Sequence, residues 1–192
     1  MTTATDTRKP ELRLPGDVHI WVFVLGDLII FSVYFVIFMI YRTQHPDVFL
    51  GSQRHLSLAL GVTNTLVLLL SSRYVALAVQ SARAKDHARA SRLIQYAAAC
   101  GVVFLLIKAY EWVALINDGY TLAHNNFFMF YFTITGVHMF HVLLGLLFLA
   151  LVLRELHNPQ LRREPMVEVG AIYWHMVDLL WVIIFALLYV VR

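Results

Sequence analysis

The residues that could do chemistry are ionisable side chains inside long apolar stretches, where each costs several kcal/mol to keep. Lys108 and Glu111 are three residues apart, which places them on one helix face where they could neutralise each other. His175 and Asp178 repeat this spacing, and Glu168 lies two helical turns before His175 on the same face. The spacing therefore predicts local pairs that face the interior of a helix bundle or a partner protein.

Three further polar residues lie in apolar stretches without an obvious neighbour. Asp27 has no basic residue within four positions, so it is either protonated or meets a partner on another helix. We expect Asn64 to make a hydrogen bond between helices. Arg73 lies near the basic end of its stretch, and we expect it to extend to lipid headgroups, including anionic ones.

The histidines raise the question of a haem or a metal, because imidazole is a common axial ligand. His138 and His141 share a helix face, and His175 could approach from another helix to complete a b-type haem or quinone site. The sequence contains neither a CxxCH nor an HExxH motif, and Cys100 is its single cysteine. The favoured interpretation is that these are core histidines, hydrogen-bonded across helices, in a chain with no catalytic, cofactor-binding or metal-binding residue.

A small transporter is a third hypothesis, with Asp27, Lys108 and Glu111 as a proton relay. Transporters of this kind are commonly built from inverted repeats. The sequence shows no internal repeat, which argues against that hypothesis.

The composition predicts an all-α membrane protein. Of the 192 residues, 60% are hydrophobic and 14% are charged, and the mean hydropathy is +0.70. A soluble globule, a disordered chain, a disulfide framework and a nucleic-acid-binding module are thereby excluded.

A helix needs about 20 apolar residues to cross a bilayer. Residues 1–17 are predicted to be a polar arm without a signal peptide, and residues 18–192 a single transmembrane domain. The five predicted spans cover residues 18–41, 55–80, 93–116, 127–153 and 168–191.

The basic residues between the spans are unevenly distributed. Arg42, Arg54 and Arg192 lie on one side of the predicted bundle. The other side carries a larger set, made up of Arg8, Lys9, Arg13, Arg83, Lys85, Arg89, Arg92, Arg154, Arg162 and Arg163. The positive-inside rule therefore predicts a cytoplasmic N-terminus and an external C-terminus.

Two segments resemble subunit III of cytochrome c oxidase. The run from Tyr131 to Gly145 is similar to that family's TGxHxxHVxxG pattern, and the run from Glu168 to Trp181 is similar to its ExxxxYWHxVDxxW pattern. Weaker similarities extend the resemblance to the whole chain after about Leu14. This chain resembles the five-span form of the family, which lacks the first two of the seven spans that many members have.

The resemblance implies a non-catalytic subunit of a bacterial respiratory complex in the plasma membrane. It implies a partner, catalytic subunit I of a haem–copper oxidase, and phospholipids bound between the helices. Asp27 stands where the family has an intramembrane carboxylate that carbodiimides modify, associated with proton uptake. Most members have glutamate there. His138, His141, Glu168, His175 and Asp178 match the family's buried polar positions, whereas Lys108 stands where mitochondrial-type members usually have Gln. With Asn64, Lys108 and Glu111, these residues make up the predicted buried polar scaffold.

A softer similarity to the branch found beside nitric oxide reductases leaves the partner's reaction open. It depends on the segment PGDVHIWVFVLGD, on Lys108 with Glu111, and on the NNFF segment at 125–128. The resemblance therefore allows haem with copper, or haem with non-haem iron, in the partner.

Overall fold

The computed structural model describes residues 18–158 and 164–191, which form helices joined by short connections. The predicted arm at 1–17 lies outside the described residues. The helices are α1 (Val18–Gln44), α2 (Pro46–Gln53), α3 (Leu58–Arg83), α4 (His87–Asn117), α5 (Asn126–His157) and α6 (Glu164–Phe185), and α6 continues into a π-helical turn, η1 (Ala186–Val190).

Five of these helices, all except α2, are long and apolar enough to cross a membrane, which confirms the predicted five-span all-α architecture. Their ends differ from the predicted ones, because a helix does not stop where its apolar stretch does. Helix α4 begins at His87, ahead of Arg89 and Arg92, because the Asp86 carboxylate accepts a hydrogen bond from the Arg89 backbone N–H at 3.0 Å. Ser57 and Asn125 cap α3 and α5 in the same way.

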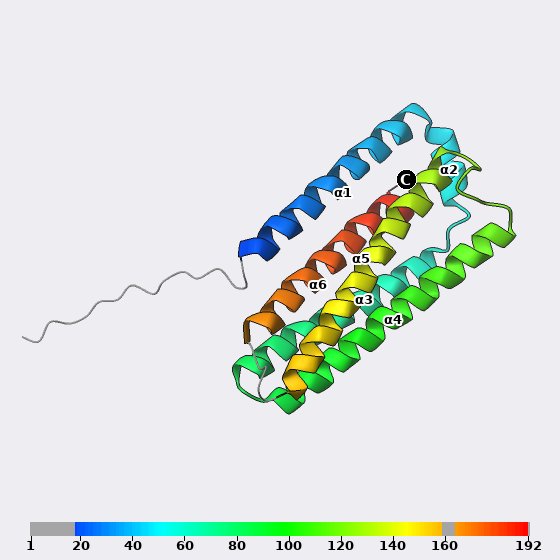
Figure 1. Ribbon diagram of the computed structural model, residues 1–192. Coiled ribbons are helices and arrows are strands. Elements are labelled where there is room, and N and C mark those ends of the chain that lie inside the picture. Colours follow the sequence, from blue (N-terminus) through cyan, green and yellow to red (C-terminus); the bar gives the residue numbers. More distant parts are fainter. Residues whose placement is uncertain (1–17, 159–163, 192) are drawn as a thin grey trace, which may run out of the picture.

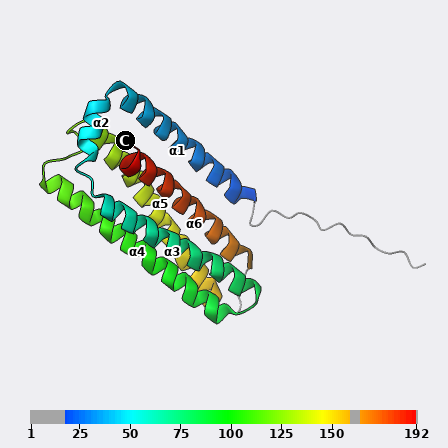
Figure 2. The same ribbon diagram turned by 180° about the vertical axis from the view of Figure 1, so that it is seen from behind.

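Helices α3 to α6 form an antiparallel bundle, and α1 lies along one side of it (Figure 1). The same arrangement is seen from behind in Figure 2. In its most apolar stretch α6 is 56% buried, whereas α1 is only 17% buried. Helix α6 therefore forms the centre of the bundle, packed against α3, α5 and α1.

The short helix α2 was not predicted. It begins at Pro46, which fits the first turn of a helix because proline lacks the N–H that would be unsatisfied there. Gln53 at its end donates hydrogen bonds from Nε2 to the carbonyl oxygens of Leu188 and Val191, both at 3.0 Å. These carbonyls lie at the end of η1, so α2 stabilises the C-terminal end of the bundle.

Candidate functional site: the polar interior of the bundle

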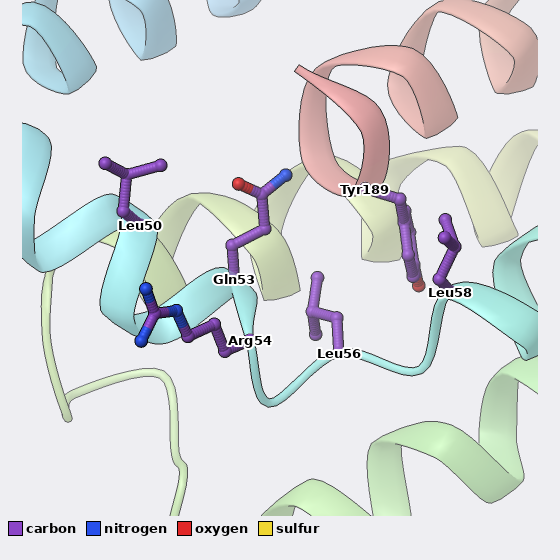
Figure 3. A pocket seen from close by; sticks show the side chains of 6 residues that line it. All are labelled: Leu50, Gln53, Arg54, Leu56, Leu58 and Tyr189. Carbon is purple, nitrogen blue, oxygen red and sulfur yellow. The ribbon is translucent and has the colours of Figure 1, made fainter. Parts of the chain in front are cut away.

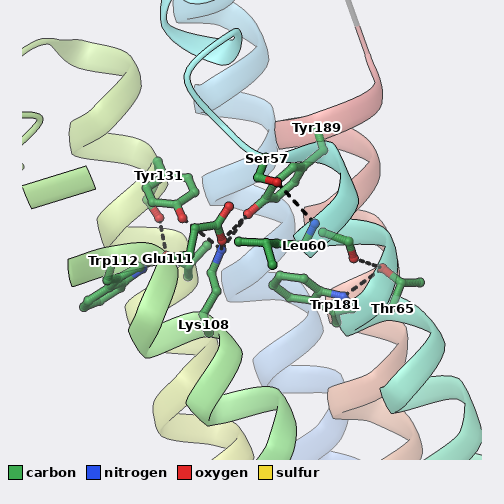
Figure 4. Close-up of polar contacts among 11 residues, drawn as sticks. Ser57, Leu60, Thr65, Lys108, Glu111, Trp112, Tyr131, Trp181 and Tyr189 are labelled. Carbon is green, nitrogen blue, oxygen red and sulfur yellow. Dashed lines mark hydrogen bonds and ion pairs between the residues drawn. The ribbon is translucent and has the colours of Figure 1, made fainter. Parts of the chain in front are cut away.

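Lys108 and Glu111 form a buried ion pair on α4, as their spacing predicts. The distance from Nζ to Oε2 is 2.8 Å, and the two side chains are 0% and 4% exposed. Two tyrosines complete the cluster (Figure 4). Lys108 Nζ donates to the hydroxyls of Tyr131 at 3.0 Å and Tyr189 at 2.7 Å, and the Tyr189 hydroxyl donates to Glu111 Oε2 at 2.7 Å. The buried charges are thus both paired and hydrogen-bonded, as burial requires.

Neither tyrosine was predicted as part of the site. They come from α5 and from η1, 23 and 81 residues away from Lys108. Their rings also surround the ammonium group, since the Tyr131 and Tyr189 ring centroids lie 4.6 and 5.2 Å from Nζ. The cluster therefore joins α4 to α5 and to the π-helical end of α6.

Tyr189 also forms part of the wall of a pocket at the C-terminal end of the bundle (Figure 3). The pocket has a volume of about 240 Å³ and is lined by Leu50, Gln53, Arg54, Leu56, Leu58 and Tyr189. The Tyr189 side chain, which lies on the wall, donates its hydroxyl inward to Glu111. Tyr189 therefore contacts both the pocket and the buried ion pair.

Replacing Tyr189 with phenylalanine is expected to destabilise the bundle more than replacing Tyr131 does. Each hydrogen bond to a charged group contributes about 1.5–3 kcal/mol, and Tyr189 makes two such bonds whereas Tyr131 makes one. Thermal denaturation in mild detergent, followed by size-exclusion chromatography, measures the difference. Equal thermal stability of the two variants would show that the Tyr189 hydroxyl stabilises the bundle no more than the Tyr131 hydroxyl does.

Asp27 meets a partner on another helix, which is one of the two alternatives left open by the sequence. Its Oδ2 lies 3.4 Å from His141 Nε2, an ion-pair distance without hydrogen-bond geometry. His141 Nδ1 lies 2.8 Å from the Val137 carbonyl oxygen, which can only accept, so Nδ1 carries a proton. An ion pair with Asp27 therefore requires a second proton on Nε2. The contact links α1 to α5 within the membrane-spanning part.

The predicted hydrogen bonds across helices are wrong for His138 and Asn64. Both side chains are 0% exposed, and neither makes a hydrogen bond to any described residue. The His138 ring instead stacks on Trp181, with a centroid distance of 5.4 Å and an interplanar angle of 30°, and meets the edge of Phe104. Packing between aromatic rings fixes His138 without a polar partner. For the buried amide of Asn64, no hydrogen-bond partner lies among the described residues.

His175 and Asp178 on α6 do not form the buried pair that their spacing predicts, and Glu168 does not join them. His175 Nδ1 makes its hydrogen bond to Ser72 Oγ at 2.8 Å and lies 4.0 Å from Asp178 Oδ2. The His175 side chain is 41% exposed, so it is not buried, whereas Asp178 is 6% exposed. Glu168 pairs with Arg83 on α3 at 2.8 Å and is also partly exposed. Two of the three polar groups on α6 therefore join it to α3.

Indole N–H groups form a set of contacts that the sequence did not reveal. Three buried or half-buried tryptophans each donate to a hydroxyl on a neighbouring helix. The pairs are Trp174 with Ser71 at 3.0 Å, Trp181 with Thr65 at 3.0 Å, and Trp112 with Thr135 at 3.2 Å. Such bonds are favoured where lipid offers no alternative partner.

The three histidines of the haem hypothesis lie in different surroundings. His138 packs against Trp181, His141 faces Asp27, and His175 is bonded to Ser72. Within residues 18–158 and 164–191, no three His, Cys, Asp or Glu side chains are placed to hold a metal ion.

These features define a multi-pass membrane protein, a helical bundle whose interior polar groups join neighbouring helices. The family model described as cytochrome c oxidase subunit III matches residues 16–191. The chain belongs to the cytochrome c oxidase subunit III family. Sequence relatives agree with this assignment.

The relatives include subunits named for different electron donors. Cytochrome c oxidase subunit 3 of Thermostichus vulcanus is 31% identical, over 94% of this chain and 88% of its own. Cytochrome bo(3) ubiquinol oxidase subunit 3 of Buchnera aphidicola subsp. Acyrthosiphon pisum is 24% identical, over 88% of this chain and 83% of its own. A protein of Aeropyrum pernix named haem–copper oxidase subunit I+III is 28% identical, over 89% of this chain but only 22% of its own.

Proposed function

We propose that this chain is the non-catalytic subunit III of a bacterial haem–copper terminal oxidase in the cell membrane. The observation that carries the proposal is the family match over residues 16–191, together with relatives named as subunit 3 of cytochrome c and ubiquinol oxidases. In this role the chain supports assembly, proton uptake and stability during aerobic electron transport. The haem and copper belong to the partner, catalytic subunit I, and phospholipids bind between helices of this chain.

The Aeropyrum pernix relative supports catalytic subunit I as the partner. Its name joins subunits I and III, and the segment similar to this chain is 22% of a longer polypeptide.

Co-purification tests this function. The chain carries an affinity tag in its native host, membranes are extracted with a mild detergent, and the bound proteins are identified by mass spectrometry. A haem–copper catalytic subunit with copper at its active site is the expected result. A catalytic subunit with non-haem iron would make the chain an accessory subunit of a nitric oxide reductase, and a chain that purifies alone with a haem spectrum would refute both.

Replacing Asp27 with asparagine tests the contribution to proton uptake. The side-chain size is kept, but the group can no longer exchange a proton or form an ion pair with His141. We expect the complex to assemble normally and to lose activity faster during sustained turnover. Activity against the number of turnovers is measured with Ser32→Ala as a control, since Ser32 bonds only its own helix backbone, at Leu28. Identical inactivation of the two variants would make Asp27 purely structural.

We also propose that the N-terminus is cytoplasmic. The proposal is supported by Arg83, Lys85, Arg89 and Arg92, which lie around the turn between α3 and α4 at the end of the bundle where α1 begins (Figure 1). Alkaline phosphatase, which is active only outside the cytoplasm, is expected to be active when fused after Arg192 and inactive when fused within the turn at Lys85.

A further inference from the structure

The outward faces of the membrane-spanning helices are not alike. On α4 the exposed residues in the middle of the span include the apolar Val102, Leu106 and Val113, together with Tyr110, whose hydroxyl is its one polar group. On α5 they are Phe140, Leu143 and Leu147. These faces suit contact with lipid chains, which neither donate nor accept hydrogen bonds.

The face shared by α3 and α6 carries polar groups at the same level. His175 is 41% exposed, and its Nδ1 is bonded to Ser72, which places the two helices side by side there. Arg73, the next residue on α3, is exposed. Neither His175 Nε2 nor the Arg73 guanidinium makes a hydrogen bond to any described residue. This face therefore presents hydrogen-bonding capacity that the chain itself does not use.

The depth of these groups makes lipid an unsuitable neighbour. His175 lies nine residues from the start of the apolar part of α6 at Met166, which is about 14 Å along the helix. The hydrocarbon core is about 30 Å thick, so the imidazole lies well inside it. Arg73 can extend part of the way to the headgroups, but the shorter His175 side chain cannot. A protein neighbour is needed to satisfy it.

We infer that the outward face of α3 and α6, comprising Ser72, Arg73, His175, Leu179 and Val182, is where a transmembrane helix of the catalytic subunit docks. The inference rests on the proposed function. Leu179 and Val182 lie on the same side of α6 as His175 and are exposed, which supplies an apolar surface around the polar centre. The partner helix presents oxygen atoms, a hydroxyl to the imidazole and a carboxyl or carbonyl oxygen to the guanidinium.

Charge argues against a second copy of this chain on the same face. A two-fold dimer packed through α3 and α6 would bring two Arg73 guanidinium groups toward each other in a medium of low dielectric constant. Of the described carboxylates on α6, Glu168 pairs with Arg83, and Asp178 is buried 4.0 Å from His175 Nδ1.

Photo-cross-linking in the assembled complex tests this inference. The photoreactive residue p-benzoylphenylalanine replaces Leu179 or Val182 on α6, and Leu106 or Val113 on α4 in matched controls. After irradiation of native membranes we expect a cross-link to the catalytic subunit from both α6 positions and from neither α4 position. Cross-links from α4 alone, a cross-linked second copy, or no α6 cross-link in a complex that contains the catalytic subunit would each overturn the inference.

A substitution adds a quantitative measurement. His175→Leu removes the outward imidazole together with its hydrogen bond to Ser72 on α3, and it keeps an apolar side chain of suitable size, so the helix remains acceptable to the membrane. We expect about five- to tenfold less catalytic subunit to co-purify after a detergent wash, the effect of about one lost hydrogen bond. Phe140→Leu on α5 is the control and is expected to leave recovery unchanged. Unchanged recovery with His175→Leu would contradict the inference, whereas absence of the catalytic subunit from the unsubstituted complex would refute the proposed function itself.

Discussion

Replacing Glu111 with leucine is expected to remove most of the folded protein from the membrane. Lys108 is fully buried, and Glu111 is the carboxylate that balances its charge, 2.8 Å away. Removing one partner of a buried ion pair costs about 3–5 kcal/mol, because the other charge stays buried without compensation. That cost is comparable with the whole stability of many domains. The amount of monodisperse protein extracted in mild detergent measures it.

A double variant separates the loss of charge balance from a loss of packing. Lys108→Met together with Glu111→Leu removes both charges and retains side chains of similar length. We expect it to recover most of the folded protein, because replacing a buried pair by apolar residues is often neutral or stabilising. If the double variant were as unstable as Glu111→Leu alone, the side-chain packing and not the uncompensated charge would be responsible.

The second large effect is expected at Gly145 on α5. A Cβ atom there would lie 2.8 Å from Cε3 and 2.9 Å from Cζ3 of Trp174, closer than real contacts allow. Gly101 of α4 is equally close to this indole, since its Cβ would lie 2.7 Å from Trp174 Cη2. The indole is held further by its N–H bond to Ser71. We expect Gly145→Ala to cost about 1–3 kcal/mol and a larger side chain such as leucine to prevent folding.

Gly26→Ala is the control for this series. A Cβ at Gly26 meets nothing within 4 Å, and alanine favours helix over glycine. We therefore expect Gly26→Ala to have at least the thermal stability of the unsubstituted protein in detergent. Because Gly101 and Gly145 contact the same ring, the costs of alanine at both positions should not add. A tolerated leucine at Gly145 would show that Trp174 can move away.

The sequence predicted the features that depend on a single helix. It did not predict the contacts between side chains of different helices. Five spans follow from apolar length, and the Lys108–Glu111 pair follows from helical spacing, and both are found. The partner of Asp27 could not be identified, because it depends on how α1 crosses α5. For His138 the polarity of the imidazole suggested a hydrogen bond, but its surroundings are aromatic rings from α4 and α6.

Tyr131 and Tyr189 were missed for the same reason, because their contacts with Lys108 depend on how the helices pack. Nothing near Tyr189 in the sequence indicates that it reaches a lysine 81 residues earlier. The short helix α2 was not predicted, because its eight residues are too few to form a membrane span. The implied roles of Asp27 and of the polar residues in assembly and proton uptake stay predictions.

The central position of α6 has a consequence for biogenesis. Synthesis delivers α3 and α4, which are joined by a short turn, well before α6. Until α6 arrives, Lys108 lacks the Tyr189 hydroxyl, and the indole partners of Ser71 and Thr65 are missing. Nascent chains therefore complete the polar contacts between α3, α4 and α6 only when α6 inserts, although Ser71 and Thr65 already bond backbone carbonyl oxygens and Lys108 already bonds Glu111 and Tyr131.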